Sequence, residues 1–110
     1  VNAKIANVVK NNKTEVDMRK FYKRVVCQNG FSMSVQAGSS QYCSPRIDGA
    51  IRYSEVEVGF PSAEEPLIME YAEDPSEPTE TVYGWVPASV VKQVIEKHGG
   101  LEEGETPPLK

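Results

Sequence analysis

The sequence predicts an α+β domain in which an antiparallel sheet of four to five strands packs on one C-terminal helix. Three patterns lead to this fold class. The dipeptide Asn29-Gly30 separates two stretches of alternating polar and apolar residues, 20–28 and 31–37, which is the strongest short-range sign of a β-hairpin. A third alternating stretch ends at Phe60, and an apolar stripe with the period of a helix begins at Val90. A chain of 110 residues is long enough for one such domain with one core.

The register of the hairpin follows from the length of its loop. A two-residue loop at Asn29-Gly30 pairs Gln28 with Phe31, Val26 with Met33, Arg24 with Val35 and Tyr22 with Ala37. This register collects five apolar side chains on one face, namely Tyr22, Val26, Phe31, Met33 and Val35. Because the side chains of the other face are polar, we expect the apolar face to join the core.

The middle of the chain combines turn residues with short strands. Residues 38–49 contain two glycines, three serines and one proline, and they predict a loop. Residues 50–60 predict a strand with a bulge or bend near Ser54, because Ile51 and Tyr53 are out of phase with the apolar positions that follow. Three further segments are expected: a short strand or one helical turn at 66–72, an acidic loop at 73–80 and a strand at 81–86.

The C-terminal helix has recognisable ends. Pro87 suits the first helical position, and Gly99 suits the residue that ends the helix. The apolar stripe between them consists of Val90, Val91, Val94 and Ile95. His98 then lies in the last turn, where we interpret it as a cation that interacts with the helix dipole. Residues 101–110 show no apolar pattern, so we expect a disordered tail.

Residues 1–17 differ in composition from the remainder, being rich in Asn and Lys. Codons for Thr14 to Val16 can contain a ribosome-binding sequence upstream of an ATG at Met18, and Val1 can be encoded by a GTG start. One hypothesis is therefore that residues 1–17 are a flexible or non-native leader and that the domain spans residues 18–100. The alternative is a genuine basic arm or short helix. We expect the fold to survive deletion of residues 1–17.

The apolar runs of the chain are too short for a membrane span or a signal peptide, so we expect a cytoplasmic protein without membrane contact. A net charge of −4 argues against nucleic acid as a partner. Residues 53–91 hold nine carboxylates and no Lys or Arg. Such a surface can steer a partner protein, and the alternative is a face that only solubilises the protein. The candidate protein-binding residues are Glu55, Glu57, Glu73, Asp74, Glu77 and Glu80.

The loop at 38–49 and its surroundings form the candidate ligand site. Its small residues leave backbone N–H groups accessible, arginine offers a bidentate fork to phosphate or carboxylate, and aromatic rings offer a stacking surface. The candidate ligand-binding residues are Tyr42, Ser44, Arg46, Arg52, Tyr83 and Trp85. The alternative interpretation is an ordinary surface loop with aromatic residues in the core.

No motif predicts catalysis, a metal site or a cofactor. Cys27 and Cys43 are sixteen residues apart, which fits no zinc or redox spacing. We therefore expect two reduced, partly buried thiols, with a disulfide as the less favoured alternative. The chain has a single histidine, so a histidine-rich metal site is excluded.

Two resemblances add to these patterns. The segments CQNGFSMSVQA (27–37), YCSPR (42–46), YSEVEVGFPS (53–62), TVYGWVP (81–87) and KHGG (97–100) resemble a family of small bacteriophage-encoded proteins without an assigned activity. This resemblance covers about residues 18–100 and implies a phage origin and a bacterial host. A shorter stretch, GWVPASVV (84–91), resembles the end of an SH3 domain, but the apolar stripe beyond Val91 departs from that pattern.

Together these observations predict a non-catalytic binding protein. The first expectation is a phage accessory factor that acts by occupying a host protein in the bacterial cytoplasm. A second is a protein that sequesters a nucleotide-like anion, and a third is a decoration component of the virion. The sequence leaves open whether the chain forms a homo-oligomer.

Overall fold

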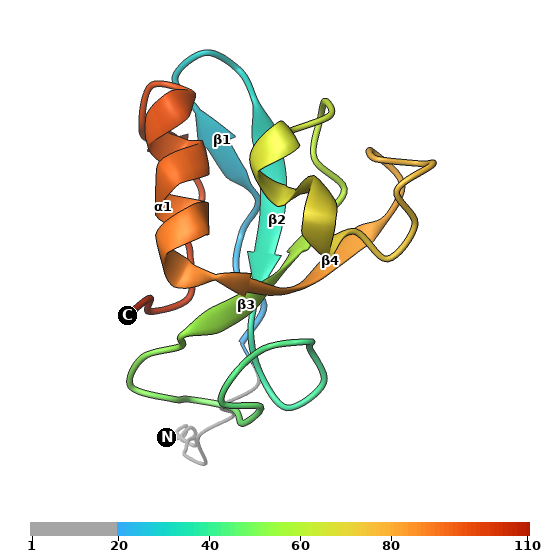
Figure 1. Cartoon of the computed structure of the whole chain (residues 1–110). Coiled ribbons are helices and arrows are strands. Elements are labelled where there is room, and N and C mark those ends of the chain that lie inside the picture. The colour runs from blue at the N-terminus through green and yellow to red at the C-terminus, as the bar shows by residue number, and fades with distance from the viewer. Residues whose placement is uncertain (1–19) are drawn as a thin grey trace, which may run out of the picture.

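The structure is a computed structural model that describes residues 20–110, and it shows the predicted antiparallel sheet with a C-terminal helix (Figure 1). The sheet has five strands in the order β4-β3-β2-β1-β5, and every neighbouring pair is antiparallel. The strands are β1 (Val25–Cys27), β2 (Ser32–Gln36), β3 (Glu55–Gly59), β4 (Val82–Pro87) and β5 (Leu101–Glu103). The helix α1 spans Ala88–Lys97, and a 3₁₀ helix, η1, spans Pro66–Tyr71. The α+β fold class predicted from the sequence is therefore confirmed.

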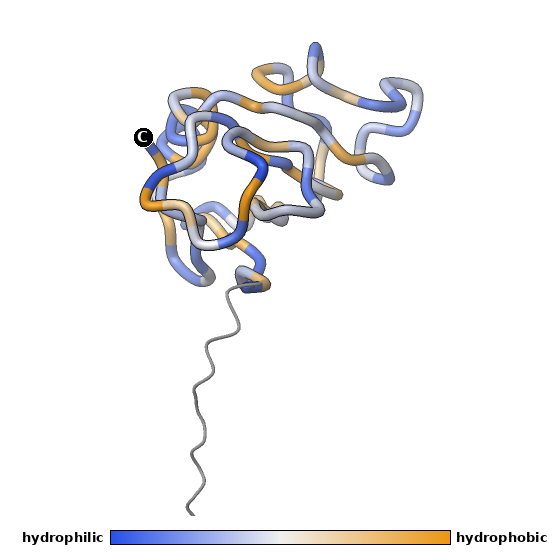
Figure 2. Tube along the Cα trace, turned by 90° about the horizontal axis from the view of Figure 1, so that it is seen from below, coloured by the Kyte–Doolittle hydropathy of each residue, from blue (hydrophilic) through white to orange (hydrophobic). Residues whose placement is uncertain are grey.

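The core lies between one face of the sheet and the two helices. Val91 and Val94 of α1 and Ile68 of η1 are fully buried against the strands. The strands contribute alternating side chains, of which Met33, Val35, Val56 and Val58 are fully buried. Hydrophobic and hydrophilic segments alternate along the trace, in keeping with this one-sided burial (Figure 2).

The hairpin forms between β1 and β2, but the predicted register is wrong by one residue. Cys27 N donates to Phe31 O (2.8 Å) and Gly30 N donates to Cys27 O (2.9 Å), so the loop has three residues and Gly30 takes a φ of 94°. A three-residue loop of this kind ends in a bulge with glycine in the left-handed region. The slip reverses the faces of β1, so Val25 and Cys27 enter the core in place of Val26 and Tyr22.

The expected strand over residues 50–60 is shorter in the structure. The strand β3 begins only at Glu55, and Ile51 is 88% exposed. The irregularity expected near Ser54 is present, since Ser54 N and Glu55 N both donate to Ser44 O at 2.9 and 3.4 Å. The segment that fitted either a strand or a helical turn forms the helix η1.

The C-terminal tail, expected to be disordered, instead belongs to the fold. Its first residues form β5, which pairs with β1, and Glu105 N donates to Lys23 O (3.1 Å). Further along, Lys110 N donates to Tyr53 O (2.9 Å), and the chain ends near the first turn of α1 (Figure 1). These contacts are hydrogen bonds between backbone groups, so they require no apolar pattern in the sequence of the tail. The ordered unit therefore extends beyond residue 100.

Three further expectations concern residues 1–17, a membrane span and the stretch 84–91. The expectations for residues 1–17 concern a segment outside the described residues. Within residues 20–110, no helix combines the length and the apolar character that crossing a membrane requires. The stretch 84–91 does end β4 and begin α1, but the helix continues to Lys97, as the apolar stripe suggested.

Candidate binding site

The candidate site begins at a bulge in β4. Val58 pairs with Tyr83 and Val56 pairs with Val86, so Gly84 and Trp85 together lie opposite the single residue between those valines. Trp85 takes a φ of 50°, which a residue with a large side chain rarely adopts. The indole is 47% exposed as a result, whereas its neighbours Tyr83 and Val86 are fully buried. The bulge thus brings a tryptophan to the surface within an otherwise regular strand.

Tyr42 covers one side of this tryptophan. The two ring centroids are 5.0 Å apart with an angle of 27° between the planes, and Trp85 N donates to Tyr42 O (3.0 Å). Gly84 makes the approach close, because a Cβ there would lie 3.2 Å from Tyr42 Cβ. On the other side, Tyr42 N donates to Glu57 Oε1 (2.9 Å). The stack is therefore held to the sheet through both its backbone and its packing.

Three of the six predicted ligand residues come together here. Arg46 lies over the Tyr42 ring, with Cζ 5.4 Å from the centroid, and thereby joins the stack. The prediction for Tyr83 is wrong, because its side chain is fully buried and its hydroxyl donates to Pro78 O. Ser44 N donates to Glu55 O (3.0 Å), which ties its backbone to β3, and Arg52 is exposed outside the stack.

A cavity of about 330 Å³ lies beside the stacked rings. It is lined by Tyr42, Tyr71, Glu73, Val82, Gly84 and Trp85. Glu73 N donates to Val82 O (2.9 Å), which fixes the backbone of this acidic lining residue next to β4. Neither Tyr71 nor Gly84 belongs to a pattern in the sequence that predicts binding. The only signal available for them was their position, because Tyr71 lies two residues before the acidic loop and Gly84 directly precedes the tryptophan.

The acidic residues predicted to bind protein separate into two groups. Glu57 is committed to Tyr42, and Glu55 lies half-buried at the start of β3. The other group occupies the loop between η1 and β4, which projects away from the body of the domain (Figure 1). We use the name aromatic–acidic face for the cavity residues Tyr42, Tyr71, Glu73 and Trp85 together with the exposed carboxylates that follow in the loop, Asp74, Glu77 and Glu80. Within it, Asp74 Oδ1 accepts from Ser76 N (3.1 Å), which shapes the loop.

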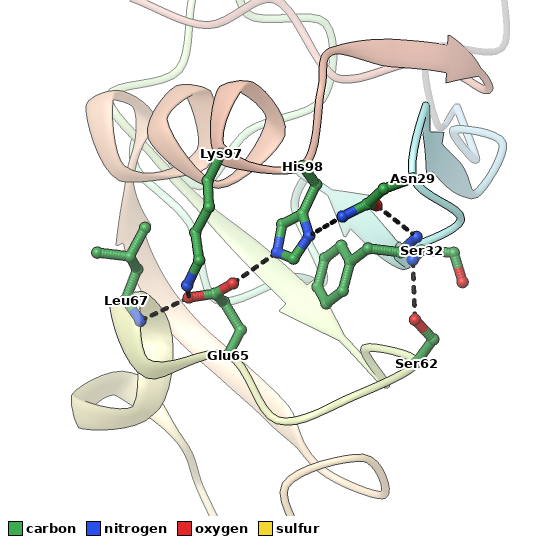
Figure 3. A network of polar contacts seen from close by, with 8 residues as sticks. Asn29, Ser32, Ser62, Glu65, Leu67, Lys97 and His98 are labelled. Atoms are coloured by element: carbon green, nitrogen blue, oxygen red, sulfur yellow. Dashed lines mark hydrogen bonds and ion pairs between the residues drawn. The ribbon is translucent and has the colours of Figure 1, made fainter.

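A second polar cluster joins η1, α1 and the hairpin loop (Figure 3). The Glu65 carboxylate, only 1% exposed, lies 2.7 Å from His98 Nε2 and 2.8 Å from Lys97 Nζ. It also accepts from Leu67 N (2.9 Å). Burial alone would raise the pKa of Glu65, but the hydrogen bonds from Lys97, Leu67 and His98 outweigh it, so that pKa lies below its ordinary value.

The hydrogen-bond network also assigns the state of His98. Asn29 Oδ1 accepts from Phe31 N (3.0 Å), so the amide nitrogen of Asn29 is the group that faces His98 Nδ1 at 2.9 Å. Nδ1 then accepts, and the proton on Nε2 is donated to Glu65. The Phe31 ring stacks on the imidazole at 4.0 Å. Through its two ring nitrogens His98 therefore connects the hairpin loop to Glu65, a contact that its interpretation as a dipole cation did not include.

The remaining features offer less specific chemistry. Both cysteines are buried and unpaired, and burial raises the pKa of the Cys27 thiol. Among residues 20–110, no three His, Cys, Asp or Glu side chains are placed to hold a metal ion. An open groove of about 580 Å³ runs between α1 and the C-terminal segment, lined by Lys92, Ile95, Glu96, Gly99, Gly100, Leu101, Thr106 and Leu109. The groove has no dominant charge, because its lining contains one lysine, Lys92, and one glutamate, Glu96.

The aromatic–acidic face is therefore the part of the described chain with the most selective combination of groups. It brings together exposed rings, a cavity and a series of carboxylates. In comparisons with known proteins, the chain matched no protein-family model, no curated protein and no solved structure.

Proposed function

We propose that this chain is a non-catalytic binding protein that docks a basic segment of a partner protein on the aromatic–acidic face. The observation that carries the proposal is the exposed Tyr42–Trp85 stack beside a cavity that Glu73 also lines. Rigid aromatic side chains at the surface are the groups that most often anchor protein interfaces. The carboxylates of the adjacent loop would steer a positively charged partner toward these anchors.

The backbone of Trp85 supports a binding role. A tryptophan with a φ of 50° is strained by on the order of 1 to 3 kcal/mol, and such strain persists where the surrounding structure over-determines it. The strained residue does not fill the core, since its indole is 47% exposed. The fold thus carries a conformational cost in order to present an aromatic ring to the outside.

The charges at the site favour a cationic partner over the nucleotide-like anion considered above. Glu73 lines the cavity, and the loop that continues from it contributes Asp74, Glu77 and Glu80. Of the two arginines suggested as anion ligands, only Arg46 reaches the stack, where it lies over the Tyr42 ring. A phosphate in this cavity would face a carboxylate, which opposes binding.

The resemblance of residues 18–100 to small bacteriophage proteins suggests where this partner would be found. We place it among the proteins of the bacterial host cytoplasm, where the chain would act by occupying a basic surface of its target. This part of the proposal depends on the resemblance and not on the geometry. A decoration role in the virion would instead require the chain to be retained in purified phage particles.

The test is affinity purification from a bacterial lysate, followed by calorimetry with each recovered partner. We expect a partner that binds the wild type and the Glu96→Gln variant but is lost with Trp85→Asn or Glu73→Gln. Glu96→Gln is the matched control, since it removes one charge from α1 away from the face. Asparagine suits the positive φ at residue 85, and thermal unfolding would verify that each variant is folded. The proposal is rejected if every recovered partner binds all four proteins with equal affinity.

A further inference from the structure

Resting on the proposed function, we infer that the cavity beside Trp85 is a receptor for the guanidinium group of one arginine of the partner. The cavity joins three aromatic rings with one carboxylate, from Tyr42, Tyr71, Trp85 and Glu73. Aromatic faces attract cations through the ring quadrupole, most strongly for tryptophan. A carboxylate next to such faces adds an ion pair to the same ligand.

The cavity is large enough for the head of one arginine side chain. Its volume of about 330 Å³ is at the lower end of the range for ligand pockets. Two backbone hydrogen bonds hold the wall of the cavity in place. Trp85 N donates to Tyr42 O, and Glu73 N donates to Val82 O, at 3.0 and 2.9 Å. The backbone that carries these side chains is therefore organised before a ligand arrives.

Arginine fits this combination better than lysine. Its guanidinium is planar, is weakly hydrated, stacks on aromatic rings and pairs with a carboxylate through two parallel hydrogen bonds. The chain already contains such a contact, because the guanidinium carbon of Arg46 lies 5.4 Å from the centroid of the Tyr42 ring. A ligand arginine would make the corresponding contact within the cavity, with Glu73 in addition.

The only tryptophan of the chain is the residue that lines the cavity, so its fluorescence reports directly on occupancy. We would titrate the protein with N-acetyl-arginine amide at constant ionic strength. The neutral N-acetyl-citrulline amide has nearly the same shape, and the lysine derivative carries the same charge without the planar fork. The variants are Glu73→Gln and the matched control Glu96→Gln, which removes a charge from α1, outside the cavity and outside the aromatic–acidic face.

The expected result is a saturable fluorescence change with the arginine derivative and a weaker one with the lysine derivative. Glu73→Gln should weaken arginine binding by about tenfold, as for loss of one charged hydrogen bond, and Glu96→Gln should leave it unchanged. An equal response to citrulline or lysine, or equal binding by the two variants, would overturn the inference. If the arginine derivative fails while a basic partner protein still requires Trp85, this inference is wrong and the proposed function stands.

Discussion

The imidazole of His98 lies 2.7 Å from the carboxylate of Glu65, which connects the end of α1 to the residue that begins η1. Asn29 holds the opposite ring nitrogen, so the same imidazole also reaches the hairpin loop. Three segments far apart in the sequence are thus joined through one ring (Figure 3). The helix η1 that follows Glu65 ends at Tyr71, two residues before Glu73, so it leads from this cluster to the aromatic–acidic face.

Replacement of Glu65 by Gln should destabilise the fold by about 1 to 3 kcal/mol, because a buried charged acceptor with three donors is lost. The effect should depend on pH. The pKa of Glu65 is lower in the folded chain than in the unfolded chain, so its stabilisation is complete above the unfolded value of about 4.3 and disappears as pH falls through the folded value. Chemical denaturation at several pH values would measure both proteins. A difference that stays constant through the acidic range would contradict the assignment.

Gly30 tests the three-residue hairpin loop. Its φ is 94°, and a Cβ there would meet no atom within 4 Å, so only backbone strain opposes substitution. Gly30→Val should destabilise by roughly 1 kcal/mol or more, whereas Gly30→Asn should be milder because asparagine tolerates positive φ. Thermal unfolding of the two variants would show the difference. Equal losses would mean that the loop does not require a left-handed residue.

Gly104 tests whether the C-terminal tail belongs to the fold. A Cβ at Gly104 would lie 1.9 Å from Arg24 O, whereas one at Gly100 would meet nothing within 4 Å, although φ is positive at both. Gly104→Ala should therefore lower the unfolding temperature well beyond the effect of Gly100→Ala. Each 1 kcal/mol lost corresponds to about 4–8 °C for a domain of this size. If the two variants unfold at the same temperature, β5 does not pair with β1 in solution.

The acidic loop should govern how fast the partner arrives. Replacing Glu73, Asp74, Glu77 and Glu80 together by Gln or Asn should slow association more than it speeds dissociation, and wild-type affinity should fall with added salt. The fold should survive, because these residues lie on an exposed loop. Surface plasmon resonance with the purified partner would give both rates. Binding that is abolished by Arg46→Ala and Arg52→Ala but unaffected in the acidic variant would contradict docking of a basic segment. It would indicate an anionic ligand instead.

The sequence predicted the elements whose pattern is local. Alternation identified β2 and the apolar part of β3, and the stripe at Val90 to Ile95 identified α1. The register of β1 was predicted wrongly because Asn29-Gly30 fits both a two-residue and a three-residue loop. The strand registers that these two loops impose differ by one residue. The tail was not predicted because β5 pairs through backbone atoms and buries none of its side chains.

The sequence predicted some residues of the candidate site but not the contacts between distant segments that form its cavity. Tyr42, Arg46 and Trp85 were noticed because their residue types suit binding, and they do come together. Tyr83 was misplaced because the bulge at the next two residues interrupts the alternation of β4. The cavity requires Tyr71 from η1 and Gly84 from β4 to meet the loop at residue 42, and no spacing in the sequence encodes that contact.

The most direct test of the central claim is an NMR titration of isotope-labelled protein with a short arginine-rich peptide. Chemical shifts of every backbone amide and of the single indole N–H would locate the contact without assuming where it lies. The account predicts saturable shifts that are largest at the Trp85 indole and at the amides of Tyr42, Tyr71 and Glu73, and that disappear with Trp85→Asn. Shifts concentrated along the groove between Lys92 and Leu101, or shifts that persist in that variant, would contradict it.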